Sequence, residues 1–168
     1  NVPCENCAKA KAQQKVVHRV ITHVKSNVLG KRMFLDLSSI KRPVDKKIKI
    51  NKKRFWCMCV EESVGFKVST FHASKTDMIR PMAEYFLKER EEKRALRYLR
   101  MVNAGENCKL IELVSTSDYD LNIKPEYTAR KTPQQNAPVK VGFKTTYARA
   151  KADFNAANVP ITIKYLIF

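Results

Sequence analysis

Apolar and polar positions divide the first half of the chain into three short extended segments. Apolar residues run through 32–38 and 55–60, and a third, more mixed run covers 65–71. A tight turn at Glu61–Val64 joins the second run to the third. Short apolar runs bounded by turn residues predict strands, and three such strands in succession predict an antiparallel meander.

The second half of the chain alternates helical and extended patterns. Ser74 and Asp77 have the spacing of a helix-capping pair, and the helix that they begin is predicted to continue to about Arg94. The later predicted elements are a strand at Ala95–Val102, a short helix at Glu106–Val114, a strand at Asn122–Tyr127 and a helix at about Gln135–Asn155. This order predicts an α/β fold in which helices flank a mixed, five-stranded sheet.

The last predicted helix carries two stripes of side chains. An apolar stripe recurs at helical spacing, at Val139, Phe143, Tyr147, Ala150 and Phe154. A neighbouring basic stripe contains Lys140, Lys144 and Lys151. The apolar stripe predicts packing against the sheet, and the basic stripe is a place where an anion could lie.

Both ends of the chain differ from its centre. Residues 1–31 carry six Lys/Arg against one acid and predict a basic arm that is partly helical from Ala8 to about Lys25. Gly30 ends the connector that follows. Residues 159–168 form an apolar, β-prone tail that begins around Pro160. We therefore divide the chain into an arm (1–31), a central domain (32–158) and a tail (159–168).

The charge of the chain is strongly one-sided. Lys and Arg total 33 against 16 Asp and Glu, which leaves a formal net charge of +17. Such a charge favours polyanionic partners, with nucleic acid first and an acidic membrane surface second. No apolar run approaches the ~20 residues of a membrane helix, and no signal-peptide pattern is visible, so we expect no membrane insertion.

The basic residues are clustered, which disfavours the alternative of a merely basic protein. Lys41–Arg54 holds eight Lys/Arg and one acid, and two interpretations stay open for it: a solvated turn or a phosphate-contacting finger. Contacts to phosphates position a backbone without reading its sequence. The expected nucleic-acid contacts are Lys41, Arg42, Lys46, Lys47, Lys49, Lys52, Lys53, Arg54, Arg130, Lys131, Lys140, Lys144, Arg149 and Lys151.

Cysteine usage indicates a reducing, intracellular compartment, because the five cysteines are an odd number at low density. Cys4 and Cys7 have zinc-knuckle spacing. With His18 and His23 they form a set close to a Cys2His2 finger but two residues short in the middle. Zn²⁺ binding by these four residues and unpaired thiols both stay open.

Two of the other cysteines and the third histidine are interpreted as structural. Cys57 and Cys59 are predicted to be packing residues that point to opposite faces of their strand. His72 follows a strand and has no evident partner in the sequence. None of the three is expected to bind a metal.

Seven short motifs follow one another in the order of a known family. They are Cys4–Lys11 (CENCAKAK), Gly30–Ser39 (GKRMFLDLSS), Phe55–Val60 (FWCMCV), Ser74–Asp77 (SKTD), Asn103–Asn107 (NAGEN), Glu126–Asn136 (EYTARKTPQQN) and Phe143–Arg149 (FKTTYAR). Together they resemble the integrase region of Ty1/copia-type retrotransposons over nearly the whole chain. The resemblance implies a ribonuclease-H-like fold and a role in DNA integration. It also implies that the protein is located in the nucleus, and an organelle stays open as the alternative location.

The resemblance also implies a metal-dependent site that this chain lacks in part. The family binds two Mg²⁺ ions with two Asp and one Glu, and the ions assist phosphoryl transfer. Asp36 matches the first Asp, but Val102 and Lys140 stand where the other two carboxylates belong. Glu106 is a weak stand-in because it lies on the next element. We therefore expect neither bound Mg²⁺ nor catalysis, and a salt bridge between Asp36 and Lys140.

Three functional hypotheses follow for this pseudoenzyme-like sequence. The first is a catalytically inactive, integrase-like domain that binds DNA or RNA through phosphate contacts. The second is an active integrase in which positions 102 and 140 are variant or misread. The third is a domesticated structural subunit of a ribonucleoprotein or another large assembly, docked by its arm and its tail.

Overall fold

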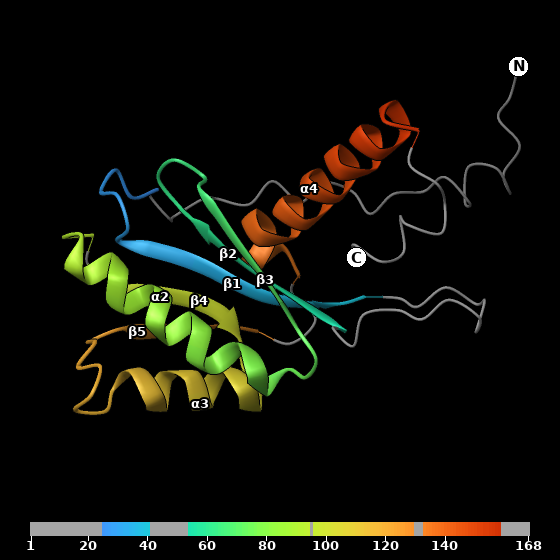
Figure 1. Cartoon of the computed structure of the whole chain (residues 1–168). Helices are drawn as coiled ribbons and strands as arrows, with labels where there is room; N and C mark the ends of the chain where they lie inside the picture. Colours follow the sequence, from blue (N-terminus) through green and yellow to red (C-terminus); the bar gives the residue numbers. More distant parts are fainter. Residues whose placement is uncertain (1–24, 41–53, 95, 130–132, 159–168) are drawn as a thin grey trace, which may run out of the picture.

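The structure of the chain, a computed structural model, describes residues 25–40, 54–94, 96–129 and 133–158 (Figure 1). Three predicted features lie outside these residues. They are the helical part of the basic arm, nearly all of the basic finger at 41–53, and the apolar tail.

The centre of the protein is a five-stranded sheet with the order β3-β2-β1-β4-β5. The strands are β1 (Arg32–Ser39), β2 (Phe55–Glu61), β3 (Lys67–His72), β4 (Tyr98–Val102) and β5 (Lys124–Thr128). β1 pairs antiparallel with β2, and β2 with β3, whereas β4 and β5 extend the sheet in parallel from β1. The predicted meander and the predicted mixed sheet are both confirmed.

Helices cover both faces of the sheet (Figure 1). α2 (Ile79–Glu91) and α3 (Gly105–Val114) pack on one face, and α4 (Ala137–Ala156) packs over β2 and β1 on the other. Short 3₁₀ turns, η1 (Thr76–Met78) and η2 (Pro133–Asn136), precede α2 and α4. This order of helices matches the order expected from the sequence.

Several element ends differ from the predictions by a few residues, and two of these differences have clear local reasons. β3 begins at Lys67 rather than at Gly65, because Gly65 has a φ of +72° and belongs to the turn, where its N–H donates to the Glu61 carbonyl at 3.1 Å. α2 ends at Glu91 rather than near Arg94, and Lys93 just beyond it has a φ of +61°, which cannot continue a helix.

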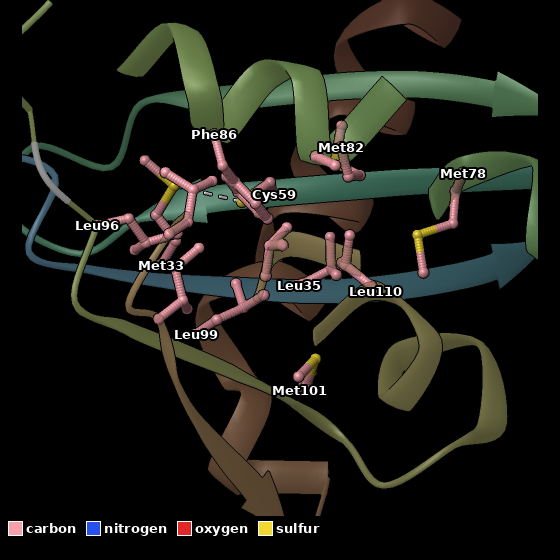
Figure 2. Packing of buried hydrophobic residues seen from close by; sticks show 14 of the residues in the cluster. Met33, Leu35, Cys59, Met78, Met82, Phe86, Leu96, Leu99, Met101 and Leu110 are labelled. Carbon is pink, nitrogen blue, oxygen red and sulfur yellow. Dashed lines mark hydrogen bonds between the residues drawn. The ribbon is translucent and has the colours of Figure 1, made fainter. Parts of the chain in front are cut away.

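The larger core lies between the sheet and helices α2 and α3. Figure 2 shows Met33 and Leu35 of β1 packed among Phe86 of α2, Leu99 of β4 and Leu110 of α3. All five side chains are at most 1% exposed. Interlocked packing of this kind holds the strands and the two helices as one body.

The thiols of Cys57 and Cys59 both lie in this core, as packing residues. The prediction that they point to opposite faces was wrong, because residues two apart on a strand share a face. Burial raises the pKa of Cys57 to about 12. His72 is buried as well, and its Nε2 lies 2.7 Å from the hydroxyl of Thr70, so it has the partner that the sequence did not reveal.

A smaller core lies beneath α4. Val139 packs there against Phe34, Trp56 and Met58, and the Trp56 ring meets Phe143 edge to face with ring centroids 4.8 Å apart. The predicted apolar stripe of α4 is therefore buried only near its start, and Tyr147, one turn beyond Phe143, is 51% exposed.

Gly142 allows α4 to approach the sheet closely. A Cβ atom at this position would lie 2.7 Å from the Met58 Sδ and 3.3 Å from the Val60 Cγ2. The helix thus sits directly on β2, and its first two turns are fixed relative to β1. Among the helices of the described residues, none is long and apolar enough to cross a membrane.

Candidate functional site

Asp36 lies near the end of β1, on the face that α4 covers in part. Phe34, two residues earlier, packs beneath α4, and strand alternation places Asp36 on the same face. The side chain is half-buried, and its Oδ1 accepts a hydrogen bond from the Leu37 N–H at 2.9 Å. Asp36 is therefore held at the sheet surface by its own strand.

The surroundings of Asp36 disfavour its charged form on balance. Burial raises the pKa of this carboxyl group, whereas the Leu37 hydrogen bond and the charge of Lys140 lower it. Burial has the larger effect, so the pKa lies above its usual value. In a metal site built from several carboxylates, the carboxylates also disfavour one another's ionisation until the cation binds. Here Lys140 already supplies a positive charge.

Lys140 lies in the first turn of α4 with its side chain exposed. Its charge acts on Asp36, so the fold brings the two side chains into the same neighbourhood. No nitrogen–oxygen distance within 4.0 Å joins them among the ion pairs of the described residues. The expected salt bridge is therefore not formed, and the pair interacts at longer range.

Val102 ends β4 on the same face of the sheet. The parallel register pairs Phe34 with Arg100, and two residues farther along each strand come Asp36 and Val102. The Val102 side chain is 42% exposed and has no atom that could bind a cation. The topology thus brings positions 36, 102 and 140 to one end of the sheet, but only one of them carries a carboxylate.

Two buried asparagines hold this end of the sheet together, and the sequence interpretation missed them. The Asn107 side-chain amide donates to the Val102 carbonyl at 2.7 Å, and that of Asn136 donates to the Leu35 carbonyl at 2.9 Å. Asn107 thereby ties α3 to β4, and Asn136 ties the start of α4 to β1. Both asparagines end motifs, NAGEN and PQQN, which were the available signal.

Glu106 is directed toward a different partner. It lies in the first turn of α3, and its carboxylate is 3.7 Å from the ammonium of Lys75. Among the residues that the structure describes, no group of three His, Cys, Asp or Glu side chains could hold a metal ion together. The proposed zinc ligands Cys4, Cys7, His18 and His23 lie outside the described residues.

The expected phosphate contacts are described in part. Arg54, Lys140, Lys144, Arg149 and Lys151 are all exposed, and the other nine lie at 41–53 or 130–131, outside the described residues. At about 100° per residue, Lys144 and Lys151 lie within about 40° of Lys140 around α4, whereas Arg149 lies about 180° away. One backbone segment cannot contact Lys140 and Arg149 at the same time.

Two arginines on the same sheet face already have a carboxylate partner. Glu126 of β5 accepts hydrogen bonds from Arg32 and Arg100, each at 2.8 Å in its shortest contact. The Arg100 guanidinium also lies over the Phe34 ring, 5.6 Å from its centroid. At the end of the sheet that holds Asp36, the lysines of α4 are exposed, whereas the Arg100 guanidinium already has a carboxylate partner.

Comparison with solved structures gives a clear likeness of fold. No protein-family model and no curated protein sequence matches the chain. A chain in the cryo-EM structure of the simian T-cell lymphotropic virus intasome, in complex with the PP2A regulatory subunit B56 gamma, matches with a TM-score of 0.57. The match has 10% sequence identity and covers 82% of this chain and 46% of that chain.

At this identity the likeness shows the fold alone. The mixed five-stranded sheet, with helices on both faces, is a ribonuclease-H-like α/β fold, as the resemblance implied. The likeness to a chain of an intasome is compatible with an integrase-like architecture and carries no information about activity.

Proposed function

We propose that this chain is an integrase-derived domain of the Ty1/copia type that binds nucleic acid through phosphate contacts and does not catalyse strand transfer. The observation that carries this proposal is the position of Lys140. It begins an exposed lysine stripe on α4 and lies close enough to Asp36 to affect its pKa. The sequence motifs and the intasome-like fold support the descent.

The absence of transfer chemistry is proposed from the donor set. Two divalent cations need several oxygen ligands close together. Of the three positions, Asp36 offers a carboxylate whose pKa is raised by burial, Val102 offers no ligand atom, and Lys140 offers a cation. The ammonium of Lys140 repels a divalent ion and attracts a phosphate, so the same end of the sheet favours an anion.

The lysine stripe defines the geometry of binding. Lys140, Lys144 and Lys151 span eleven residues of one helix face, which is about 16 Å at 1.5 Å per residue. Duplex phosphates along one strand are spaced more closely than this, so the stripe can contact several of them. Such contacts release counterions and do not distinguish between base sequences.

The salt dependence of binding tests the proposal. We would measure the affinity for a fluorescein-labelled duplex by anisotropy at 50–200 mM salt, for the full chain and for Lys144→Ala and Lys151→Ala. If a lysine contacts a phosphate, its replacement by alanine should make the slope of log affinity against log salt shallower by about 0.9. Arg149→Ala removes the same charge from the opposite side of α4 and should leave the slope unchanged. A flat salt response, or equal slopes for all variants, would rule the proposal out.

A second candidate function, a subunit of a larger assembly, is favoured by an apolar surface at the other end of β1. Val28, Leu29, Val64 and Phe66 are 46–70% exposed there. Glu61 joins the two loops, because it accepts hydrogen bonds from the Gly30 and Val64 N–H groups. Co-purification with one defined complex, lost on Phe66→Ser and retained by Val141→Ser on α4, would select this function.

A further inference from the structure

A concave site lies at the end of the sheet opposite Asp36. It has a volume of about 440 Å³ and is bounded by the C-terminal part of α2, the segment before β4 and the segment before β5. β1, β4 and β5 run in parallel, so the start of β4 and the end of β4 are at opposite ends of the sheet. The concavity is therefore separate from the lysine stripe of α4.

The floor of this site is apolar and belongs to the larger core. Phe86, Leu96, Leu121 and Ile123 line it, and each is at most 8% exposed. Figure 2 shows Phe86 and Leu96 at the same end of the core cluster. Because these side chains are fixed by core packing, the floor is preformed and suits a flat or compact apolar group.

The rim is positively charged. Arg90, Arg97 and Lys124 line the site against one acid, Asp120. The Lys124 N–H donates a hydrogen bond to the Arg97 carbonyl at 2.8 Å, so the main chain holds these two residues next to each other at the rim. Neither the Arg97 nor the Lys124 side chain forms an ion pair within the part of the chain that the structure describes.

One wall of the site is held in place by Arg90. Its guanidinium donates from Nη1 to the Tyr119 carbonyl at 2.8 Å and to the Asp120 carbonyl at 2.9 Å. Asp120 has a φ of +45°, a conformation that few residues other than glycine adopt. The loop before β5 is thus tied to α2 by two hydrogen bonds.

We propose that this concavity binds a nucleoside 5′-monophosphate group, with the phosphate at Arg97 and Lys124 and the base on the apolar floor. A terminal phosphate carries about −1.5 to −2 charges near pH 7, which matches two cations that have no ion-pair partner among the described residues. An internal phosphodiester carries less charge and continues in both directions, so it fits a concave site poorly. The group could come from a free mononucleotide or from the 5′ end of a strand.

Titration of the full chain with uridine 5′-monophosphate tests this site. In ¹H–¹⁵N spectra, we expect saturable shifts of the Arg97, Tyr98, Asn122 and Lys124 amides. Arg97→Ala and Lys124→Ala should each weaken binding about tenfold, since each removes a charged hydrogen-bond donor. Lys109→Ala, which removes an exposed charge from α3 outside the site, should leave the affinity unchanged.

Uridine and inorganic phosphate separate the two halves of the site. Each should bind more weakly than the nucleotide, because uridine engages only the floor and inorganic phosphate engages only the rim. Equal affinity of either fragment and the nucleotide, an unchanged affinity in both rim variants, or no amide shifts would overturn the proposal. If a 5′-phosphorylated trinucleotide shifts the same amides, the source of the group is the end of a strand. If it does not shift them, the source is the free nucleotide.

The site is independent of the proposed phosphate contacts on α4. Lys144→Ala and Lys151→Ala should leave nucleotide binding unchanged, and Arg97→Ala should leave the salt slope of duplex binding unchanged. All of the substituted side chains are exposed, so loss of folding is not expected, and the thermal midpoint of each variant checks this.

Discussion

The side-chain amide of Asn136 donates a hydrogen bond to the main-chain carbonyl of Leu35 at 2.9 Å. Asn136 precedes α4, and Leu35 immediately precedes Asp36 on β1. Asn136 is 1% exposed and Leu35 is fully buried. This bond fixes the first turn of α4, and with it Lys140, against the strand that carries Asp36.

Replacing Asn136 should destabilise the protein more than the loss of such a small side chain suggests. In Asn136→Ala the buried Leu35 carbonyl loses its side-chain donor, which costs about 1–3 kcal/mol of unfolding free energy. Urea denaturation measures the loss, and Gln134→Ala, an exposed position in the same 3₁₀ turn, is the control. Equal midpoints for the two variants would show that the bond does not secure α4.

Asp36→Asn should stabilise the protein at neutral pH. The folded-state pKa of Asp36 is raised, chiefly by burial, so its ionised form costs free energy in the folded state. That cost is full above the folded-state pKa and disappears below the unfolded value of about 3.9. The Oδ1 of the asparagine can still accept the hydrogen bond from the Leu37 N–H.

Unfolding measured from pH 3 to pH 7 checks the sign of this effect. The stability gain of Asp36→Asn should grow as the pH rises through the folded-state pKa. In Lys140→Ala the pKa of Asp36, followed by carboxyl NMR shifts, should rise further, because a neighbouring positive charge is lost. A variant Asp36→Asn that is less stable at pH 7 would show instead that Lys140 outweighs burial.

Gly142→Ala should destabilise the protein although alanine favours helices. The added Cβ would meet the Met58 Sδ at 2.7 Å, and Met58 is fully buried. Overpacking costs roughly 1–3 kcal/mol, which exceeds or offsets the gain in helix propensity of about 1 kcal/mol.

Gly105→Ala is the matched control for this effect. Gly105 begins α3, and a Cβ built there would meet no atom within 4 Å beyond its chain neighbours and the backbone of its own helix. It should leave the thermal midpoint unchanged or raise it. A midpoint for Gly142→Ala as high as that for Gly105→Ala would contradict the close contact between α4 and β2.

Divalent cations should distinguish this chain from a variant with a complete carboxylate set. Mg²⁺ or Mn²⁺ should leave the thermal midpoint of the natural sequence unchanged. Val102→Asp combined with Lys140→Glu places two further carboxylates at the end of the sheet that holds Asp36. Cation binding to that variant should stabilise it by about 2.7 kcal/mol at one hundred times the dissociation constant.

Val102→Asn combined with Lys140→Gln is the control for the metal experiment, because it removes the same native side chains without adding charge. It should not respond to the cation. A midpoint of the natural sequence that rises with Mg²⁺ would mean that Asp36 recruits a cation despite Lys140, and the proposed inactivity would then be wrong.

Much of the fold was predictable because its elements follow local patterns. The runs around Leu35 and Cys57 became central strands, and the start of the apolar stripe, at Val139, became the buried part of α4. The motifs also indicated that positions 36, 102 and 140 belong to one site. Helical period alone places Arg149 opposite Lys140, although the sequence interpretation grouped them as one contact surface.

The sequence by itself determined which chemical groups are present: one carboxylate, one valine and one lysine at the three positions, in a strongly basic chain. Only the tertiary structure decided how they act on one another. Burial outweighs the Lys140 charge at Asp36, and Glu126 pairs with both Arg32 and Arg100. Both outcomes depend on distances and desolvation between segments far apart in the chain, and no local pattern of residues encodes these.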